Sequence, residues 1–242
     1  MDASRRQQYL DAMGITRYVV REAAVDDHPQ AVVEPREPAA PIPVAKSPKP
    51  AAGVSAQQSA WEVLRARVAS CTACELHASR TQTVFGIGNE SAQLMIVGEA
   101  PGAEEDRQGE PFVGRAGQLL TAMLHAIGLT REAVYIANIL KCRPPGNRNP
   151  TAEEVAKCQP FLIQQLSLIK PKVMLAVGGV AAHNLLETDE AVGRLRNRIH
   201  YYGEDRTPLL VTYHPAYLLR RPEEKAKVWQ DLQKLYGMLH GD

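Results

Sequence analysis

The sequence predicts a three-layer α/β/α fold around a central, mostly parallel sheet of four strands. One observation is a series of short apolar runs rich in β-branched residues, which are typical of buried parallel strands. A second is that the segments between them carry apolar residues at three- and four-residue spacing, as helices do. This alternation is typical of a parallel sheet covered on both faces, with ligands bound beyond the carboxyl ends of its strands.

Each expected element has its own signal in the chain. Apolar runs predict strands at residues 93–97, 134–139, 173–177 and 209–213. Helical spacing predicts helices at residues 60–68, 117–127, 152–169 and 180–186. Thr151 and Glu154 form a capping-box pattern at the start of the third of these helices.

A proline-rich segment divides the chain. Residues 23–53 hold seven of the 17 prolines and no aromatic residue, so they offer nothing to bury. We therefore expect a disordered linker at residues 23–54, a short docking peptide at residues 1–22, and one domain at residues 55–242.

Composition excludes several classes of protein. Lys and Arg number 28 against 27 Asp and Glu, so any nucleic-acid binding must come from a local patch. No window approaches the ~20 apolar residues of a membrane span, and the start MDASRRQQ lacks the apolar region of a secretory signal. We expect a cytoplasmic protein without membrane contact. Four cysteines are too sparse for a secreted disulfide scaffold.

The four cysteines suggest a metal site. Cys71 and Cys74 form a C-x2-C pair, whereas Cys142 and Cys158 are isolated. A zinc ribbon would usually supply a second tight pair. One pair with two isolated cysteines can instead surround an iron–sulfur cube, in which each iron takes one thiolate. Four unrelated reduced thiols are the alternative, because free cysteine packs well as a small hydrophobe. Spacing alone leaves these possibilities open.

The loop after the first expected strand is the strongest candidate for a site. Residues 98–114 hold four Gly, four Glu, one Asp and two Pro, at the edge where open α/β sheets bind ligands. The loop lacks the lysine and glycine patterns of nucleotide-binding loops, and its acids alone would suit a solvated turn. Phe112 has no strand or helical period that would place it in a core. Its ring could offer a flat face to a base.

Polar residues follow two other expected strands. Asn138 ends the second strand and precedes a basic, proline-stiffened loop at residues 141–150, while His214 follows the last strand. A lone histidine or a strand-end asparagine is more often structural than functional. Because successive parallel strands end at one edge, their joint placement favours a shared site.

Three motifs and the cysteines together resemble a known family. GEAPGAEEDRQGEPFVGRAGQLL, YIANILKCRPPGNRNP and HPAYLLR, in that order, are similar to the family 4 uracil-DNA glycosylases, the iron–sulfur members of their superfamily. The resemblance runs from about Ser55 to the C-terminus. It implies an α/β/α fold and hydrolysis of the bond between uracil and deoxyribose in DNA, which leaves an abasic site. It also implies a structural [4Fe-4S] cluster on Cys71, Cys74, Cys142 and Cys158.

The resemblance also implies how the base is read. Uracil must leave the duplex stack or come from a single strand. Phe112 would then stack on the ring, and the Asn138 amide would pair with O4 and N3, where cytosine presents the opposite pattern. Thymine differs by a methyl group, which the family excludes in the region of Ala100 and Glu105.

For the chemical step, the resemblance implies a carboxylate and a hydrogen-bond donor. Glu99 would stabilise the oxocarbenium-like sugar and orient water, with Glu105 as the second candidate. His214 would donate a hydrogen bond to O2 of the leaving uracil.

Basic and apolar residues near the motifs are candidate DNA contacts. For each basic residue, a plain surface charge is the alternative. Leu218 and Leu219 could wedge into the stack that the base vacates. The basic candidates are Arg143, Arg148 and Arg220, with Lys141, Arg194, Arg196, Arg198 and Arg221 as further ones.

The N-terminal peptide is not linker-like. Residues 4–21 place Tyr9, Leu10 and Met13 on one helical face. The segment is similar to the tail of the clamp-loader psi subunit, which in that family binds the chi subunit of DNA polymerase III. The resemblance implies a tether to replication machinery, and the alternative is a helix that folds back on its own domain.

Taken together, these observations predict a monomeric, nucleoid-associated uracil-DNA glycosylase. Two alternatives remain at this point. One is a non-catalytic iron–sulfur protein that binds DNA, since fold does not imply function. The other is a glycosylase for hypoxanthine or another deaminated base.

Overall fold

Four parallel strands form the centre of the fold. The computed structural model describes residues 56–241, which belong to one compact unit. The sheet has the order β1-β3-β2-β4-β6-β5, and its central pairs are all parallel. The α/β fold class is confirmed. The central strands are the four that the apolar runs predicted: β2 (Leu94–Gly98), β3 (Tyr135–Asn138), β4 (Val173–Val177) and β6 (Thr207–Thr212).

The sheet has six strands, so the prediction of four was wrong in number. Two short strands pair antiparallel at its edges, β1 (Ile87–Gly88) on β3 and β5 (His200–Tyr202) on β6. Neither carries an apolar run, because an edge strand has only one neighbour and both are partly exposed. Their short length also limits edge-to-edge pairing with other chains.

The helices confirm four predictions and add others. The four predicted helices are α2 (Ala56–Ala69), α5 (Arg115–His125), α6 (Ala152–Ile169) and α7 (Gly179–Leu186). Not predicted were α3 (Leu76–Ser79), α4 (Ala103–Gln108), α8 (Val192–Leu195), α9 (Pro215–Arg220), α10 (Lys225–His240) and the 3-10 turns η1 (Arg131–Ala133), η2 (Pro145–Asn147) and η3 (Pro222–Glu224).

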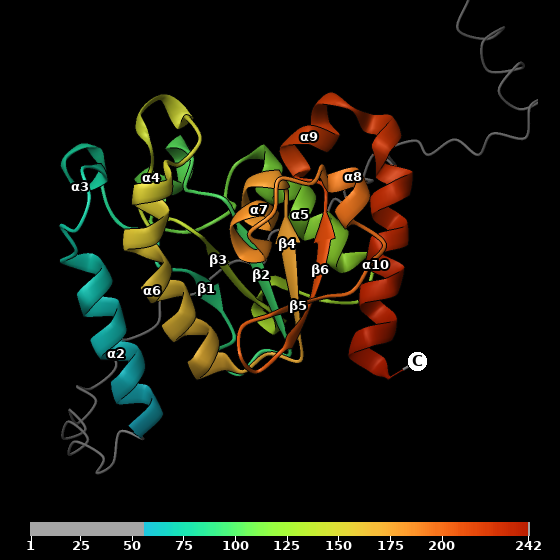
Figure 1. Cartoon of the computed structure of the whole chain (residues 1–242), viewed down its shortest axis with the longest axis horizontal. Helices are drawn as coiled ribbons and strands as arrows, with labels where there is room; N and C mark the ends of the chain where they lie inside the picture. The colour runs from blue at the N-terminus through green and yellow to red at the C-terminus, as the bar shows by residue number, and fades with distance from the viewer. Residues whose placement is uncertain (1–55, 242) are drawn as a thin grey trace, which may run out of the picture. The chain divides into compact units, whose positions relative to one another are not determined.

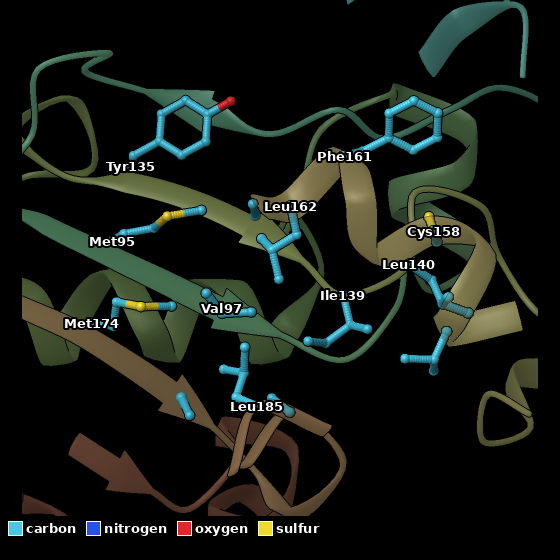
Figure 2. Close-up of a cluster of buried hydrophobic side chains, with 14 of the residues drawn as sticks. Met95, Val97, Tyr135, Ile139, Leu140, Cys158, Phe161, Leu162, Met174 and Leu185 are labelled. Carbon is cyan, nitrogen blue, oxygen red and sulfur yellow. The ribbon is translucent and has the colours of Figure 1, made fainter. Parts of the chain in front are cut away.

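The core lies in two layers, one on each face of the sheet. Successive strand residues point to opposite faces, so Met95 and Val97 join α2, α6 and α7, while Leu94 and Ile96 join α5, α9 and α10. Figure 1 shows α6 and α10 on opposite sides of the strands. Figure 2 shows Leu162 of α6 beside Met95 and Val97. The three-layer α/β/α arrangement is thus present.

The predicted capping box at the start of α6 is present. Thr151 Oγ1 accepts from the Glu154 N–H at 3.2 Å, and Glu154 Oε2 accepts from the Thr151 N–H at 2.9 Å. Glu154 also accepts two hydrogen bonds from the Arg148 guanidinium, at 2.9 and 2.6 Å. The start of α6 therefore fixes the basic loop that follows β3.

Two expectations fall on other parts of the chain. The predicted docking peptide at residues 1–22 and linker at residues 23–54 lie outside the described residues. Within residues 56–241, no helix is both long enough and apolar enough to cross a membrane.

Candidate active site

A pocket of about 560 Å³ opens at the carboxyl edge of the parallel strands. Its walls come from the loops after β2, β3 and β6, as the strand order requires. The pocket brings together the six residues predicted for base recognition and chemistry. They are Glu99, Ala100, Glu105, Phe112, Asn138 and His214.

Asn138 is the residue whose position most clearly indicates a ligand. It ends β3, pairs in register with Gly98 of β2, and is 2% exposed. Its side-chain Oδ1 is buried and has no hydrogen-bond partner among the described residues. Leaving a buried acceptor unpaired costs about 1–3 kcal/mol, which a ligand donor would recover. The amide is therefore poised to accept a hydrogen bond in the pocket.

Gly98 lets the amide and the aromatic ring meet. A Cβ atom at this position would lie 2.4 Å from Asn138 Oδ1 and 2.6 Å from Phe112 Cζ. Real Cβ atoms do not approach other atoms so closely, so only glycine leaves this space open. The backbone continues the pairing, since the Ile139 N–H donates to the Gly98 carbonyl at 3.0 Å.

Phe112 forms an aromatic wall of the pocket although it lies in a loop. Its side chain is 7% exposed, and its φ of 55° is in the left-handed region that bulky residues rarely adopt. Glu105 holds the loop that follows it, because Glu105 Oε1 accepts from the Val113 and Gly114 N–H groups at 3.0 and 3.3 Å. The Glu105 carboxylate, one of our two candidates for orienting water, is thus engaged by backbone amides.

His214 is a neutral hydrogen-bond donor. Burial, with the nearby Arg220 charge adding to it, lowers the pKa of His214 to about 4. Nδ1 accepts from the Ala216 N–H at 3.1 Å, so the proton of the neutral ring is on Nε2. Gly178 fits against this residue, since a Cβ there would lie 3.0 Å from the His214 Cβ.

Glu99 differs from Glu105 in its surroundings. Burial raises the pKa of the Glu99 carboxyl. Within residues 56–241 its carboxylate forms no hydrogen bond, although its backbone carbonyl accepts from the Leu140 N–H at 3.1 Å. A partly desolvated carboxylate without a protein donor is suited to water or to positive charge on a ligand.

Lys141 is not on the surface, so its assignment to phosphate was wrong. It is 1% exposed, and Nζ donates to the Asn138 carbonyl at 2.9 Å and to Gln165 Oε1 at 2.7 Å. Gln165 in turn donates to the Phe85 carbonyl at 2.8 Å. This buried network supports the backbone of Asn138 from below the pocket. No sequence pattern distinguishes Gln165 from the other polar residues of α6, so it could not be predicted.

All four cysteines line one cavity. They are free thiols, and Figure 2 shows Cys158 on α6 beside Leu140. Two donors point at sulfur: Arg80 Nη1 lies 3.0 Å from Cys142 Sγ, and the Lys141 N–H lies 3.2 Å from Cys158 Sγ. Donors of this kind fit thiolates. In the described part of the chain, no three His, Cys, Asp or Glu side chains form a group that could hold one metal ion.

The predicted DNA contacts fall into two groups. Arg148 and Arg220 line the pocket. Arg143 does not line it, but it donates to Oδ1 of Asn147, a lining residue, at 2.7 Å. Arg196 is buried in an ion pair with Asp231 at 2.9 Å, so its assignment to phosphate was wrong.

The two leucines of α9 differ in exposure. Leu218 is 1% exposed and packs in the core, so its side chain cannot reach DNA as we had predicted. Leu219 is 38% exposed and is the leucine of the pair that faces outward. The helical phase of α9 makes this difference.

The fold and the pocket define an α/β/α protein with a polar, partly aromatic pocket at the carboxyl edge of its sheet. A family model described as the uracil DNA glycosylase superfamily matches residues 85–233. A type-4 uracil-DNA glycosylase of Archaeoglobus fulgidus is 45% identical over 175 residues, which cover 69% of this chain and 87% of that protein. Another from Thermotoga maritima is 43% identical over 74% of this chain and 94% of its own length. A third, from Pyrobaculum aerophilum, is 43% identical over 70% and 90%. The chain belongs to the uracil-DNA glycosylase superfamily, among its type-4 members.

Proposed function

We propose that this protein is a uracil-DNA glycosylase of DNA repair, which hydrolyses the N-glycosidic bond of deoxyuridine and leaves an abasic site. The observation that carries the proposal is the buried Oδ1 of Asn138, which has no partner within residues 56–241 and lies beside the ring of Phe112. A flat ring that presents a hydrogen-bond donor would satisfy both groups.

Base recognition follows from the hydrogen-bonding pattern of uracil. Asn138 Oδ1 accepts from N3–H, and the Asn138 amide nitrogen donates to O4, while Phe112 stacks on the ring. Cytosine presents an acceptor at N3 and a donor at N4, so both bonds would fail. A site built this way can discriminate by ~10⁴ or more. The base must first leave the stack, at a cost of a few kcal/mol.

In the chemical step, the C1′–N1 bond breaks and positive charge develops on the sugar. The Glu99 carboxylate stabilises that charge and orients a water molecule, which adds to C1′; the proton that the water loses ends, through solvent, on the uracil anion. Uracil leaves with negative charge on O2, where the His214 Nε2–H donates. A preorganised donor of this kind lowers the barrier most in an enclosed site.

Ala100 and Glu105 line the pocket beside these groups. We assign them to the side that meets C5 of uracil, where the methyl group of thymine would clash. We assign water orientation to Glu99 and not to Glu105, because two backbone N–H groups already occupy Glu105 Oε1.

We propose that Cys71, Cys74, Cys142 and Cys158 hold a [4Fe-4S] cluster. The shared cavity and the two donors aimed at sulfur support this ligand set. When bound, the cluster would supply a rigid cross-link between the turn after α2, the loop after β3, and α6. Iron and acid-labile sulfide in equal amounts would support it, and zinc without sulfide would replace it with a mononuclear site.

The DNA strand would cross the mouth of the pocket. Arg143, Arg148 and Arg220 would contact phosphates, and the exposed Leu219 would fill the vacated stack. Because its substrate is DNA, we propose that the protein acts at the nucleoid, in the cytoplasm. We also propose that it acts as a monomer.

We further propose that residues 4–21 bind the chi subunit of DNA polymerase III. The support is the helical face of Tyr9, Leu10 and Met13 in the sequence. A pull-down decides it: chi should be retained by the full chain and lost on deletion of residues 1–22. Equal retention by both forms would contradict it.

The activity test is a cleavage assay on a uracil-containing oligonucleotide, followed by alkali. Anaerobically purified wild type should create abasic sites, whereas Asn138→Ala and Glu99→Ala should not. Asn89→Ala is the matched control, because Asn89 lies at the opposite edge of the sheet. If holoprotein releases no uracil from single strands, U:A or U:G, activity on hypoxanthine oligonucleotides would indicate another base, and none would indicate a DNA-binding protein.

A further inference from the structure

The backbone of Phe112 needs support from outside its own loop. Its φ of 55° is unfavourable for a bulky residue, and such conformations cost about 1–3 kcal/mol unless the surroundings impose them. The peptide also packs closely on α5, since a Cβ at Gly117 would lie 1.7 Å from the Phe112 carbonyl oxygen. The position of the ring therefore depends on what holds the Pro111 and Phe112 peptides.

Arg131 holds these two peptides. Its Nη2 donates to the Pro111 carbonyl at 2.8 Å, and its Nη1 donates to the Phe112 carbonyl at 3.1 Å. The two ends of one planar guanidinium thus grip successive carbonyls, a geometry that the single ammonium of lysine cannot reproduce. Glu105 binds the next two N–H groups, so the left-handed residue is held on both flanks.

Arg131 does not belong to the pocket itself. Among the described residues, it is not one that lines the cavity. It lies in η1, which leads into β3, and Asn138 ends β3. One segment, η1 with β3, thus carries Arg131 at its start and Asn138 at its end. Asn138 would read the base, and Arg131 holds the backbone of Phe112.

We propose that Arg131 is a positioning residue for base binding: its guanidinium fixes the left-handed Phe112 peptide and so places the ring against uracil. The inference rests on the proposed function of the pocket. Arg131 then affects the affinity for the base only by positioning Phe112.

A double-mutant cycle tests this route. Arg131→Met should raise KM for a uracil oligonucleotide and the inhibition constant of free uracil by about five- to tenfold, with a smaller change in kcat. This is less than the loss expected on removing the ring, since base–aromatic stacking is worth about 1–3 kcal/mol. Phe112→Ala and the double variant Phe112→Ala/Arg131→Met should have the same KM within about twofold, the scatter of additive free energies. Arg131→Lys should fall between wild type and Arg131→Met.

Arg206→Met is the matched control, because it removes an exposed arginine before β6, at the opposite edge of the sheet. Melting temperature and iron content are measured for every variant. If Arg131→Met does not fold, the same cycle is run with Arg131→Lys. The inference is overturned if the Arg131 change weakens the Phe112→Ala enzyme as much as it weakens wild type, or leaves wild type unchanged. Failure of wild type to release uracil would instead remove the proposed function.

Discussion

His214 and Phe112, which both line the pocket, stack on each other. Their ring centroids are 5.7 Å apart and their planes differ by 29°. An apolar ring on one face of the imidazole excludes water, in keeping with burial as the leading cause of the lowered pKa of His214. The residue that we propose to stack on the base thus also contributes to the burial of His214.

We predict that His214→Ala lowers kcat by about 10²–10³, the usual loss on removing one preorganised donor, with little change in KM. The reason is that the Nε2–H bond to O2 strengthens only as uracil leaves. Single-turnover rates on a uracil oligonucleotide measure it. His240→Ala, a change in an exposed histidine near the C-terminus, should match wild type. An equal rise in KM with kcat preserved would mean that His214 only binds the ground state.

We predict that the acid limb of the pH–rate profile belongs to Glu99. Burial raises the pKa of this carboxyl above its ordinary 4.5, and activity needs the ionised form, so the rate should rise with pH through that raised value. No step should occur near 6.5, because the His214 pKa of about 4 keeps the ring neutral there. Single-turnover rates from pH 4 to 9 would show this. A step near 6.5 that disappears in His214→Gln would contradict a neutral histidine.

We predict that Asn138→Leu trades activity for stability. The apolar side chain of similar shape removes a buried acceptor that has no partner within the described residues, so the free energy of unfolding should rise by about 1 kcal/mol. Uracil release should fall by ~10³ or more, because both hydrogen bonds to the base are lost. Denaturant unfolding and the cleavage assay measure the two effects. A destabilised variant would show that the amide is satisfied in the free protein.

Sequence patterns predicted the parts of this fold that local chemistry decides. Buried central strands need continuous apolar residues, so the sequence predicted β2, β3, β4 and β6. The capping box of α6 depends on only two side chains, three residues apart, so it was also predictable. The edge strands β1 and β5 do not need continuous apolar residues, so their sequences did not predict them.

The residues that line the pocket could be predicted from the sequence, but the residues that hold them in place could not. Phe112 stood out because it fits no core pattern, and Asn138 because it and His214 follow strands that end at one edge of the sheet. Arg131 and Lys141 did not, because their roles depend on carbonyls that folding brings to them. Lys141 looked like a phosphate ligand within a basic loop, whereas two buried acceptors draw its ammonium inward. Contacts of this kind have no signal in local spacing.

We predict that loss of iron removes the effect of the Cys71 side chain on stability. Cys71 is partly exposed and packs only partly against the core, so Cys71→Ala should destabilise the holoprotein mainly by breaking the cluster. Melting temperatures are measured before and after oxidation with a chelator. The holoprotein should melt well above the variant, and the two should coincide once iron is removed. A difference that persists without iron would assign Cys71 a packing role instead.

We predict that Gly98→Ala lowers the rate of uracil release by on the order of 10²-fold while the fold persists. Its new methyl group would lie 2.4 Å from Asn138 Oδ1 and 2.6 Å from Phe112 Cζ, so the amide and the ring must move apart. A displacement of about 1 Å in such groups costs on the order of 10²-fold in rate. Gly203→Ala is the matched control, because no atom of the described part of the chain lies within 4 Å of a Cβ at that turn, although its φ of 69° allows a modest loss of stability. Cleavage rates, iron content and melting temperature separate the two variants. Wild-type cleavage by Gly98→Ala would mean that Asn138 and Phe112 do not act on the base together.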